Sequence, residues 1–212
     1  DEKEFYHCFS TSEHGNIFDF VMKTQNLRFG EAVKMLSNLA GMQPYTFSKQ
    51  DEERENKWKL YKSICSEFSE FYKNELFKNE NSIIAKNYLK ARGLSGVEVK
   101  NFNLGFVTEH LDYYEILKKN FDEETIKDTG LFYFDEKKKK FVSRFRNRII
   151  FPINNISGNV IGFGGRIVDD NKNVAKYINS PETPFFKKGS NLYNLDKARK
   201  LSNRLEDVYL VE

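Results

Sequence analysis

The sequence predicts an α+β fold in which helices come first and an antiparallel sheet follows. Apolar side chains recur every three or four residues between Trp58 and Leu76, which is the spacing of one face of a long helix. After Leu131 the apolar residues form short strand-like runs separated by turns. Helices followed by strands in one region are typical of α+β domains, where the helices pack on an antiparallel sheet.

The composition fits a globular protein with a real core. The chain has 212 residues, 39% hydrophobic and 15% aromatic, enough for one sizeable domain and a small appendage. Its 34 basic and 31 acidic residues leave a net charge of only +3. This balance neither requires nor excludes nucleic acid, so any basic surface must come from local clustering.

The expected cellular location rests on the absence of a membrane-spanning run and of a disulfide framework in the sequence. No run approaches the ~20 apolar residues of a membrane span. Two cysteines, Cys8 and Cys65, are too few for a disulfide framework. We therefore expect a cytoplasmic protein with no membrane partner.

The N-terminal residues are expected to form a small unit. Residues 5–9 resemble a strand and 10–15 a loop, and Asn16 is suited to cap a helix. A second helix is expected from about residue 30 to 40, with Gly41 as its stop. Residues 44–56, with mixed charge, are predicted to be a linker.

The long helix that follows carries Cys65 in its apolar stripe, so we expect a buried thiol and not a nucleophile. Ser82 and Ser95 are predicted to start two further helices, and Gly93 to end the first of them.

Two hairpins are predicted next, one around the polar run 135–140 and one around residues 154–158. A helix over 192–204 would lead to a final strand at 208–211. A strand so close to the last residue indicates a piece of a longer protein.

Arg144, Arg146 and Arg148 alternate with other residues, and in a strand they would share one face. Three guanidinium groups on one face repel each other unless an anion lies across them, and phosphates fit best. The alternative is a solvated strand face with local acidic partners.

Two further segments could approach a ligand. The glycines of residues 162–166 would let backbone approach a partner closely, although the segment lacks dinucleotide-binding spacing. A tight turn at a sheet edge is the alternative. In the extended segment 176–184, Lys176 could contact phosphate while Tyr177 stacks on a base. The lysine run 137–140 is expected to be a solvated hairpin tip.

The order of these motifs resembles bacterial primases of the DnaG type, from the end of the zinc-binding domain into the RNA polymerase core. The resemblance rests on His7-Cys8-Phe9, residues 15–20, Tyr88-Leu89, Arg92-Gly93-Leu94, residues 102–106, 144–153, 161–166 and 176–183, and Leu192-Tyr193. It covers essentially the whole chain in the family's order.

The resemblance implies a domain plan. Residues 1–43 would be the C-terminal part of a zinc-binding-like domain and 44–56 a linker. Residues 57–207 would be the N-terminal subdomain of the polymerase core, a mixture of helices and antiparallel sheet. Residues 208–212 would be the first strand of a toprim subdomain.

It also implies an activity. Such primases are DNA-directed RNA polymerases, nucleotidyltransferases that make short RNA primers on single-stranded DNA from ribonucleoside triphosphates with Mg²⁺ or Mn²⁺. Expected partners are the replicative helicase and a single-stranded DNA-binding protein.

The family's functional residues carry over to matching positions. The nucleic-acid groove would include Arg92, Arg166, Lys176, Tyr177, Asn179 and Lys188. Glu212 would be the catalytic carboxylate that helps to hold Mg²⁺. The acidic pair that completes this site would lie beyond the sequence, so the piece alone should be inactive.

The zinc site departs from the family's pattern of three cysteines and a histidine. Cys8 matches the third ligand, but Thr11 stands at the fourth, and threonine is a poor zinc ligand. His14 could substitute, but we expect a degenerate, metal-free domain. The alternative function is therefore a degenerate module that binds single-stranded nucleic acid without polymerising. Another toprim enzyme, a nuclease or topoisomerase, is disfavoured because its upstream motifs differ.

Overall fold

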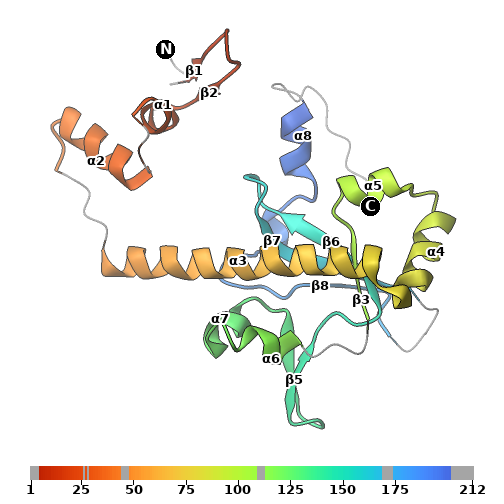
Figure 1. Ribbon diagram of the computed structural model, residues 1–212. Helices are drawn as coiled ribbons and strands as arrows, with labels where there is room; N and C mark the ends of the chain where they lie inside the picture. The colour runs from red at the N-terminus through yellow and green to blue at the C-terminus, as the bar shows by residue number, and fades with distance from the viewer. Residues whose placement is uncertain are drawn as a thin grey trace. The chain divides into compact units, whose positions relative to one another are not determined.

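The computed structural model describes residues 5–25, 27, 29–43, 48–108, 113–168 and 174–201. The chain forms two compact units, Asp1–Glu55 and Asn56–Glu212 (Figure 1). The expected strand at 208–212, including Glu212, lies outside the described residues.

The first unit contains the predicted strand and helices, and a second short strand at His14–Gly15, where the sequence predicted only a loop. Strand β1 (Tyr6–His7) pairs antiparallel with β2 (His14–Gly15), and helices α1 (Ile17–Thr24) and α2 (Phe29–Leu39) follow. The Asn16 side chain accepts hydrogen bonds from the backbone N–H of Phe18 and Asp19, which confirms the predicted cap. Gly41, just after α2, has the left-handed φ of +66° that favours glycine at a helix end.

The long helix α3 (Lys49–Lys78) begins earlier than the sequence predicted. Residues 49–56, expected in a linker, are helical. The Ser48 hydroxyl accepts from the Asp51 N–H, and the Asp51 carboxylate accepts from the Ser48 N–H. This reciprocal cap starts the helix at the edge of the charged segment.

The apolar stripe of α3 is buried as predicted, with Tyr61, Ile64, Phe68 and Tyr72 all at most 4% exposed. Cys65 is fully buried, and this burial raises the pKa of its thiol to about 12, which fits a packing role. No helix in the described ranges has the length and apolar character of a membrane span.

Short helices follow: η1 (Glu80–Ser82), α4 (Ile83–Ala91), α5 (Gly96–Asn101), α6 (Tyr113–Leu117) and α7 (Glu123–Asp128). Ser95 caps α5 together with Glu98, as predicted. Helix α4 begins directly after Ser82, which confirms the predicted start, but the Ser82 side chain does not cap it. Its hydroxyl instead donates to the carbonyl of Glu75, 2.6 Å away, tying η1 to the end of α3.

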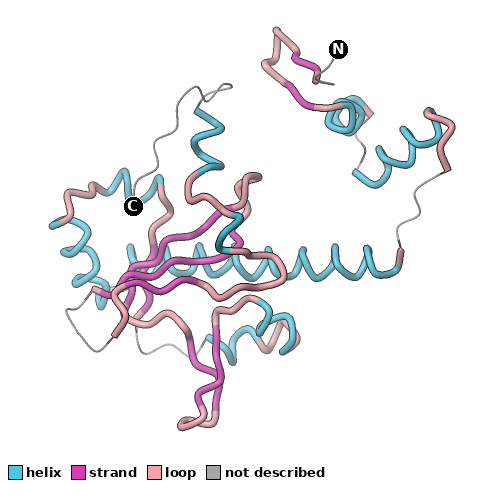
Figure 2. The backbone as a smooth tube through the Cα atoms, turned by 180° about the vertical axis from the view of Figure 1, so that it is seen from behind, coloured by secondary structure: helices cyan, strands magenta, loops and turns pink. Residues whose placement is uncertain are grey.

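Both predicted hairpins are confirmed. Strands β4 (Phe132–Asp135) and β5 (Lys140–Ser143) form a separate two-stranded ribbon. Strands β3 (Gly105–Val107), β6 (Arg148–Asn154), β7 (Val160–Ile167) and β8 (Tyr177–Asn179) form an antiparallel sheet in the order β3-β6-β7-β8 (Figure 2). The chain continues through η2 (Lys188–Ser190) to α8 (Leu195–Leu201), within the helix predicted at 192–204.

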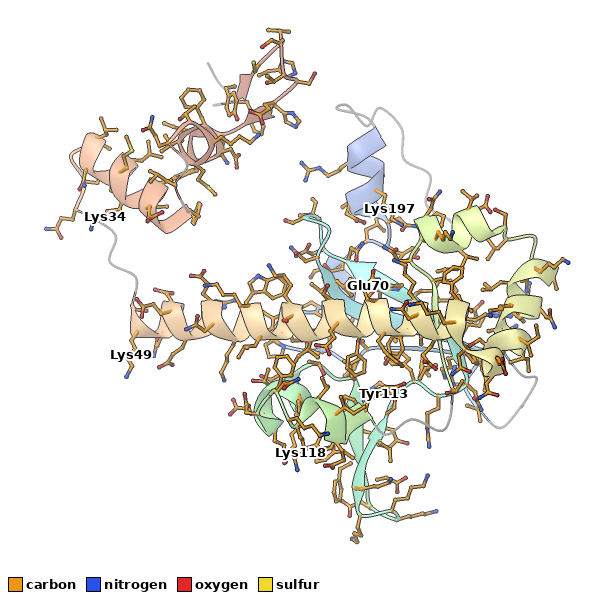
Figure 3. The ribbon with its side chains drawn as sticks, viewed as in Figure 1. Lys34, Lys49, Glu70, Tyr113, Lys118 and Lys197 are labelled. Atoms are coloured by element: carbon orange, nitrogen blue, oxygen red, sulfur yellow. The ribbon has the colours of Figure 1, made fainter. Side chains whose placement is uncertain are left out.

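The two faces of the four-stranded sheet differ. Ile161 and Phe163 of β7 join the core cluster that includes the buried stripe of α3. Helix α6 adds Tyr113, which is labelled in Figure 3. Its ring centroid lies 4.1 Å from that of Phe71. On the opposite face, Ile149 joins a second cluster with α4 and α5. Around Gly164 this face carries a recess that is lined in part by Phe186 of the first cluster and by Phe151, which packs against the second.

Candidate nucleic-acid interface

The recess on this face of the sheet has a volume of about 500 Å³, and we call it the groove. Strands β6, β7 and β8 supply one part of its lining and the segment 186–193 supplies the rest. The lining residues are Phe151, Ile153, Gly164, Gly165, Tyr177, Asn179, Phe186, Lys188, Asn191 and Tyr193. Aromatic rings beside amides and a lysine can bind a flat polar ligand such as a nucleobase.

Glycine keeps the floor of the groove free of side chains. A Cβ at Gly164 would lie 3.1 Å from the Asn179 Oδ1 atom and 3.8 Å from Phe151 Cβ. Gly164 lies inside β7, so the alternative of a tight turn for residues 162–166 was wrong. A ligand in the groove can therefore approach the backbone of β7 closely at Gly164. This agrees with the interpretation of the glycines in the sequence.

An arginine–tyrosine stack, defined as Arg92, Tyr88, Arg166 and Tyr177, adjoins the groove. The Arg166 guanidinium carbon lies 5.1 Å from the Tyr88 ring centroid and 4.7 Å from that of Tyr177. Its Nη1 also donates a hydrogen bond to the Tyr177 hydroxyl. Arg92 lies 5.3 Å from the Tyr88 centroid, and its Nε donates to the Tyr88 hydroxyl at 3.1 Å. Residues from α4, β7 and β8 thus meet at one place.

Arg166 is a buried cation with an incomplete set of partners. The residue is only 9% exposed, and its Nε is buried without a hydrogen-bond partner among the described atoms. None of the ion pairs found in the described part of the chain involves it. Two tyrosine faces offset part of the cost, by about 2 kcal/mol for a desolvated cation–π contact. An anion reaching the guanidinium would offset the rest.

Several predicted site residues lie at the groove or the stack: Arg92, Arg166, Tyr177, Asn179 and Lys188. Tyr177 is 59% exposed, so much of its ring is available to a ligand. Lys176 is exposed immediately before Tyr177, and Lys188 hydrogen-bonds through its backbone N–H to Glu182. The structure thus brings together residues that are far apart in the sequence.

The arginines at 144, 146 and 148 do not share a strand face, so that prediction was wrong. Residues 144–147 form a bend between β5 and β6, in which Asn147 has a left-handed φ of +50°. Arg144 donates to the carbonyl of Gly130 at 2.8 Å, and Arg146 donates to the Tyr133 hydroxyl at 3.0 Å.

Arg148 is 3% exposed and binds backbone instead of solvent. Its guanidinium donates to the carbonyls of Gly165, Ala175 and Lys176, at 3.3, 2.8 and 3.3 Å. These bonds join β7 to the chain entering β8, directly beside Tyr177. Arg148 therefore supports the groove from within the fold, in place of the expected phosphate contact.

Sequence reasoning missed Tyr88 as a site residue. The available signal was its spacing of four residues from Arg92, which places both on one side of α4 and its C-terminal cap. The approach of Arg166 to the same ring depends on long-range packing, which that spacing does not predict.

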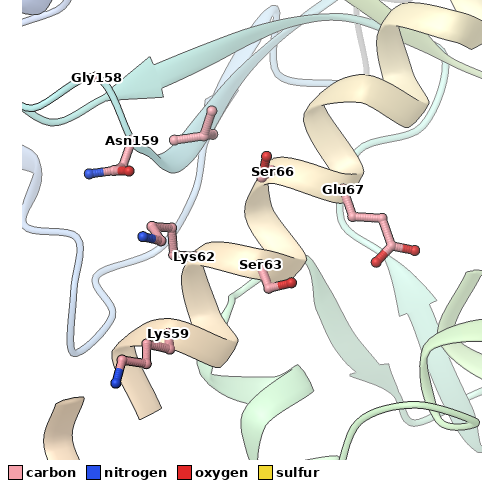
Figure 4. A pocket seen from close by; sticks show the side chains of 8 residues that line it. Lys59, Lys62, Ser63, Ser66, Glu67, Gly158 and Asn159 are labelled. Atoms are coloured by element: carbon pink, nitrogen blue, oxygen red, sulfur yellow. The ribbon is translucent and has the colours of Figure 1, made fainter. Parts of the chain in front are cut away.

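A second recess, of about 540 Å³, lies between α3 and the β6–β7 hairpin (Figure 4). Its lining includes Lys59, Lys62, Ser63 and Asn159. It contains none of the predicted site residues, so the groove is the better candidate.

The first unit carries the residues that the zinc site would use. Cys8 Sγ lies 3.1 Å from the Ser10 hydroxyl, and hydrogen bonds from Ser10 and Thr11 lower the pKa of the Cys8 thiol to about 6. The rings of His7 and His14 stack with centroids 6.2 Å apart. Within the described ranges no three His, Cys, Asp or Glu residues gather as a metal site. These residues do not complete the four-ligand set of structural zinc.

Comparison with known proteins gives the family. Residues 71–199 match the DNA primase catalytic core, N-terminal domain, and residues 1–53 match the CHC2 zinc finger. The DNA primase of Pseudomonas putida is 38% identical over 219 aligned residues, covering 100% of this chain and 32% of that protein. This chain thus spans about a third of the length of such curated relatives.

Solved structures agree with this match. The DnaG primase catalytic domain bound to ssDNA has a TM-score of 0.63 and 30% identity, covering 70% of this chain and 46% of that one. The Aquifex aeolicus primase structure with zinc-binding and RNA polymerase domains has a TM-score of 0.59 and 28% identity, covering 94% of this chain and 47% of that one. It confirms the predicted α+β class. The chain belongs to the DnaG-type DNA primase family, with a CHC2 zinc-finger domain followed by the N-terminal domain of the catalytic core.

Proposed function

We propose that the groove binds the single-stranded DNA template of a protein that synthesises RNA primers. The observation that carries this proposal is Arg166, a buried cation without an ion-paired carboxylate among the described residues, placed beside a glycine-floored recess. A guanidinium group binds phosphate well, and phosphates are the anionic groups of a nucleic-acid strand. The solved catalytic domain of a relative bound to single-stranded DNA supports the same assignment.

Different groove residues would contact different parts of the template. Arg92, Arg166 and Lys188 would contact phosphates, while the exposed ring of Tyr177 would stack on a base. Asn179 projects beside the glycine floor and would hydrogen-bond to a base edge. Most of the affinity would come from phosphate contacts and so would be independent of template sequence.

Primer synthesis would need residues outside the described part. Ribonucleoside triphosphates would be joined at a Mg²⁺ or Mn²⁺ site to which Glu212 contributes a carboxylate, and this chain alone would be inactive. The replicative helicase and a single-stranded DNA-binding protein are proposed as partners, and the cytoplasm as the location, on the strength of the family.

Thr11 favours a second candidate. A zinc-finger domain that lacks its fourth ligand fits a protein that retains nucleic-acid binding but has lost polymerisation. The match of residues 1–53 to the CHC2 zinc finger suggests zinc binding. We nevertheless propose that the first unit does not hold zinc tightly, because threonine replaces a thiolate. The intact groove residues favour the primase.

The test is titration of a fluorescently labelled single-stranded oligonucleotide with the chain at two salt concentrations. Three phosphate contacts predict that binding weakens about 20-fold between about 50 and 200 mM salt, since each contact contributes a slope of about 0.7 on single strands. Binding that is absent, or that does not respond to salt, would refute the proposal.

A further inference from the structure

We propose that Tyr88 is a positioning residue of the nucleic-acid groove, which holds the guanidinium groups of Arg92 and Arg166 together so that both can bind phosphates of one strand. The inference rests on the proposed function and deepens it. Tyr88 itself would make no contact with the template.

The geometry places the Tyr88 ring at the centre of the stack. Both guanidinium carbons lie near its centroid, at 5.3 Å for Arg92 and 5.1 Å for Arg166. The Tyr88 hydroxyl also accepts a hydrogen bond from Arg92 Nε. The two arginines come from different parts of the fold, the end of α4 and strand β7, and the Tyr88 ring contacts both.

The Tyr88 ring reduces the electrostatic repulsion between the two arginines. Two guanidinium groups that contact the same ring repel each other, most strongly where water is excluded, and Arg166 is largely buried. The negative face of an aromatic ring attracts cations without neutralising their charge. A carboxylate in the same place would hold both arginines but would also compete with phosphate. Tyr88 therefore holds the cations and leaves their charge available to a bound strand.

The ring is itself held in place. Tyr88 is partly buried and packs against the second core cluster, which includes Leu89 and Phe106. Its orientation is thus set by the packing of α4 on the sheet and does not depend on the ligand. Such pre-organisation lowers the entropy lost when the arginines bind phosphate.

The experiment compares Tyr88→Leu with Tyr88→Phe in the whole chain. Leucine keeps apolar bulk but removes the aromatic face, whereas phenylalanine keeps the face and removes only the hydroxyl. The matched control is Phe102→Leu. Phe102 is also partly buried against the second cluster and also lies beneath a cation, with Lys197 Nζ 4.4 Å from its centroid, but it does not line the groove.

The readout is the affinity for a labelled oligo-deoxythymidine and its dependence on salt. Tyr88→Leu should weaken binding about tenfold and lower the slope of log affinity against log salt by about 0.7, the share of one phosphate contact. Tyr88→Phe should restore the wild-type slope with affinity within about threefold of wild type. Phe102→Leu should leave the slope unchanged, and thermal unfolding would show whether each variant is folded.

A double-mutant cycle separates positioning from general structure. If Tyr88 acts through Arg166, then Tyr88→Leu should add little further loss once Arg166→Gln is present. Equal losses in Tyr88→Leu and Phe102→Leu, or a Tyr88→Leu protein with wild-type affinity and slope, would overturn the inference while wild-type binding still supports the groove. Wild-type protein that does not bind the oligonucleotide would instead refute the proposed function.

Discussion

The glycine floor of the groove allows a sharp test, because neighbouring glycines on β7 face opposite sides of the sheet. Gly164 faces the groove, and a Cβ there would meet the Asn179 amide at 3.1 Å. Gly165 is closed in by the core, and a Cβ there would lie 2.6 Å from the Phe145 ring. Substitution at the two positions should therefore have different consequences.

Gly164→Val should lower template affinity while leaving the fold intact. The Cβ needs a shift of only a few tenths of an ångström in the Asn179 side chain, and valine suits a strand, so we expect at most about 1 kcal/mol loss of stability. The two methyl groups would cover the floor and displace a stacked base. Losing one stacking contact costs about 1–3 kcal/mol, which corresponds to about 5- to 150-fold weaker binding.

Gly165→Ala should give the opposite result. Contact with the fully buried Phe145 ring would force the core apart, at a cost of about 1–3 kcal/mol in the free energy of unfolding. Thermal unfolding and oligonucleotide titration on both variants decide the matter, with Gly96→Ala as a control because a Cβ there meets nothing within 4 Å. A folded Gly164→Val protein with wild-type affinity would refute the assignment of the floor to the template.

Three further outcomes are expected. Arg148→Ala should lower the free energy of unfolding by about 3 kcal/mol, because backbone carbonyls lose a buried charged donor. The same variant should leave the salt dependence of template binding unchanged. A weaker salt dependence in a fully folded variant would show that Arg148 contacts phosphate instead. In the full-length protein, elemental analysis should find less than one zinc per chain, and Thr11→Cys should increase zinc retention. Stoichiometric zinc that Cys8→Ser abolishes would contradict this. In the full-length protein, Glu212→Gln should reduce ribonucleotide incorporation more than about a hundredfold while template binding persists; incorporation near the wild-type level would remove Glu212 from the metal site.

The fold was predictable where a repeating pattern records local structure. The stripe on α3, the Asn16 and Ser95 caps and both hairpins all follow from residues within a few positions of one another. The start of α3 was missed because mixed charge before residue 57 resembles a linker, although the Ser48–Asp51 cap begins the helix there.

The site was predictable only in part, because its geometry depends on long-range contacts. The alternating pattern of arginines alone predicted an exposed Arg148. In the structure, the left-handed backbone of Asn147 precedes it, and its hydrogen bonds to three carbonyls distant in the sequence hold it in a buried position. The meeting of Tyr88 with Arg166 likewise depends on how α4 packs on the sheet. The family resemblance supplied residue names for the groove but not this arrangement.

The central claim is that Arg166 binds the template, and the most direct measurement follows its side-chain Nε–H resonance by NMR during titration with single-stranded oligonucleotide. A guanidinium is one delocalised group, so phosphate binding at any of its nitrogens should move the Nε–H signal. We predict a saturable shift for Arg166 and none of similar size for Arg148, whose guanidinium donates to backbone carbonyls. An oligonucleotide that binds while the Arg166 signal stays fixed would contradict the account.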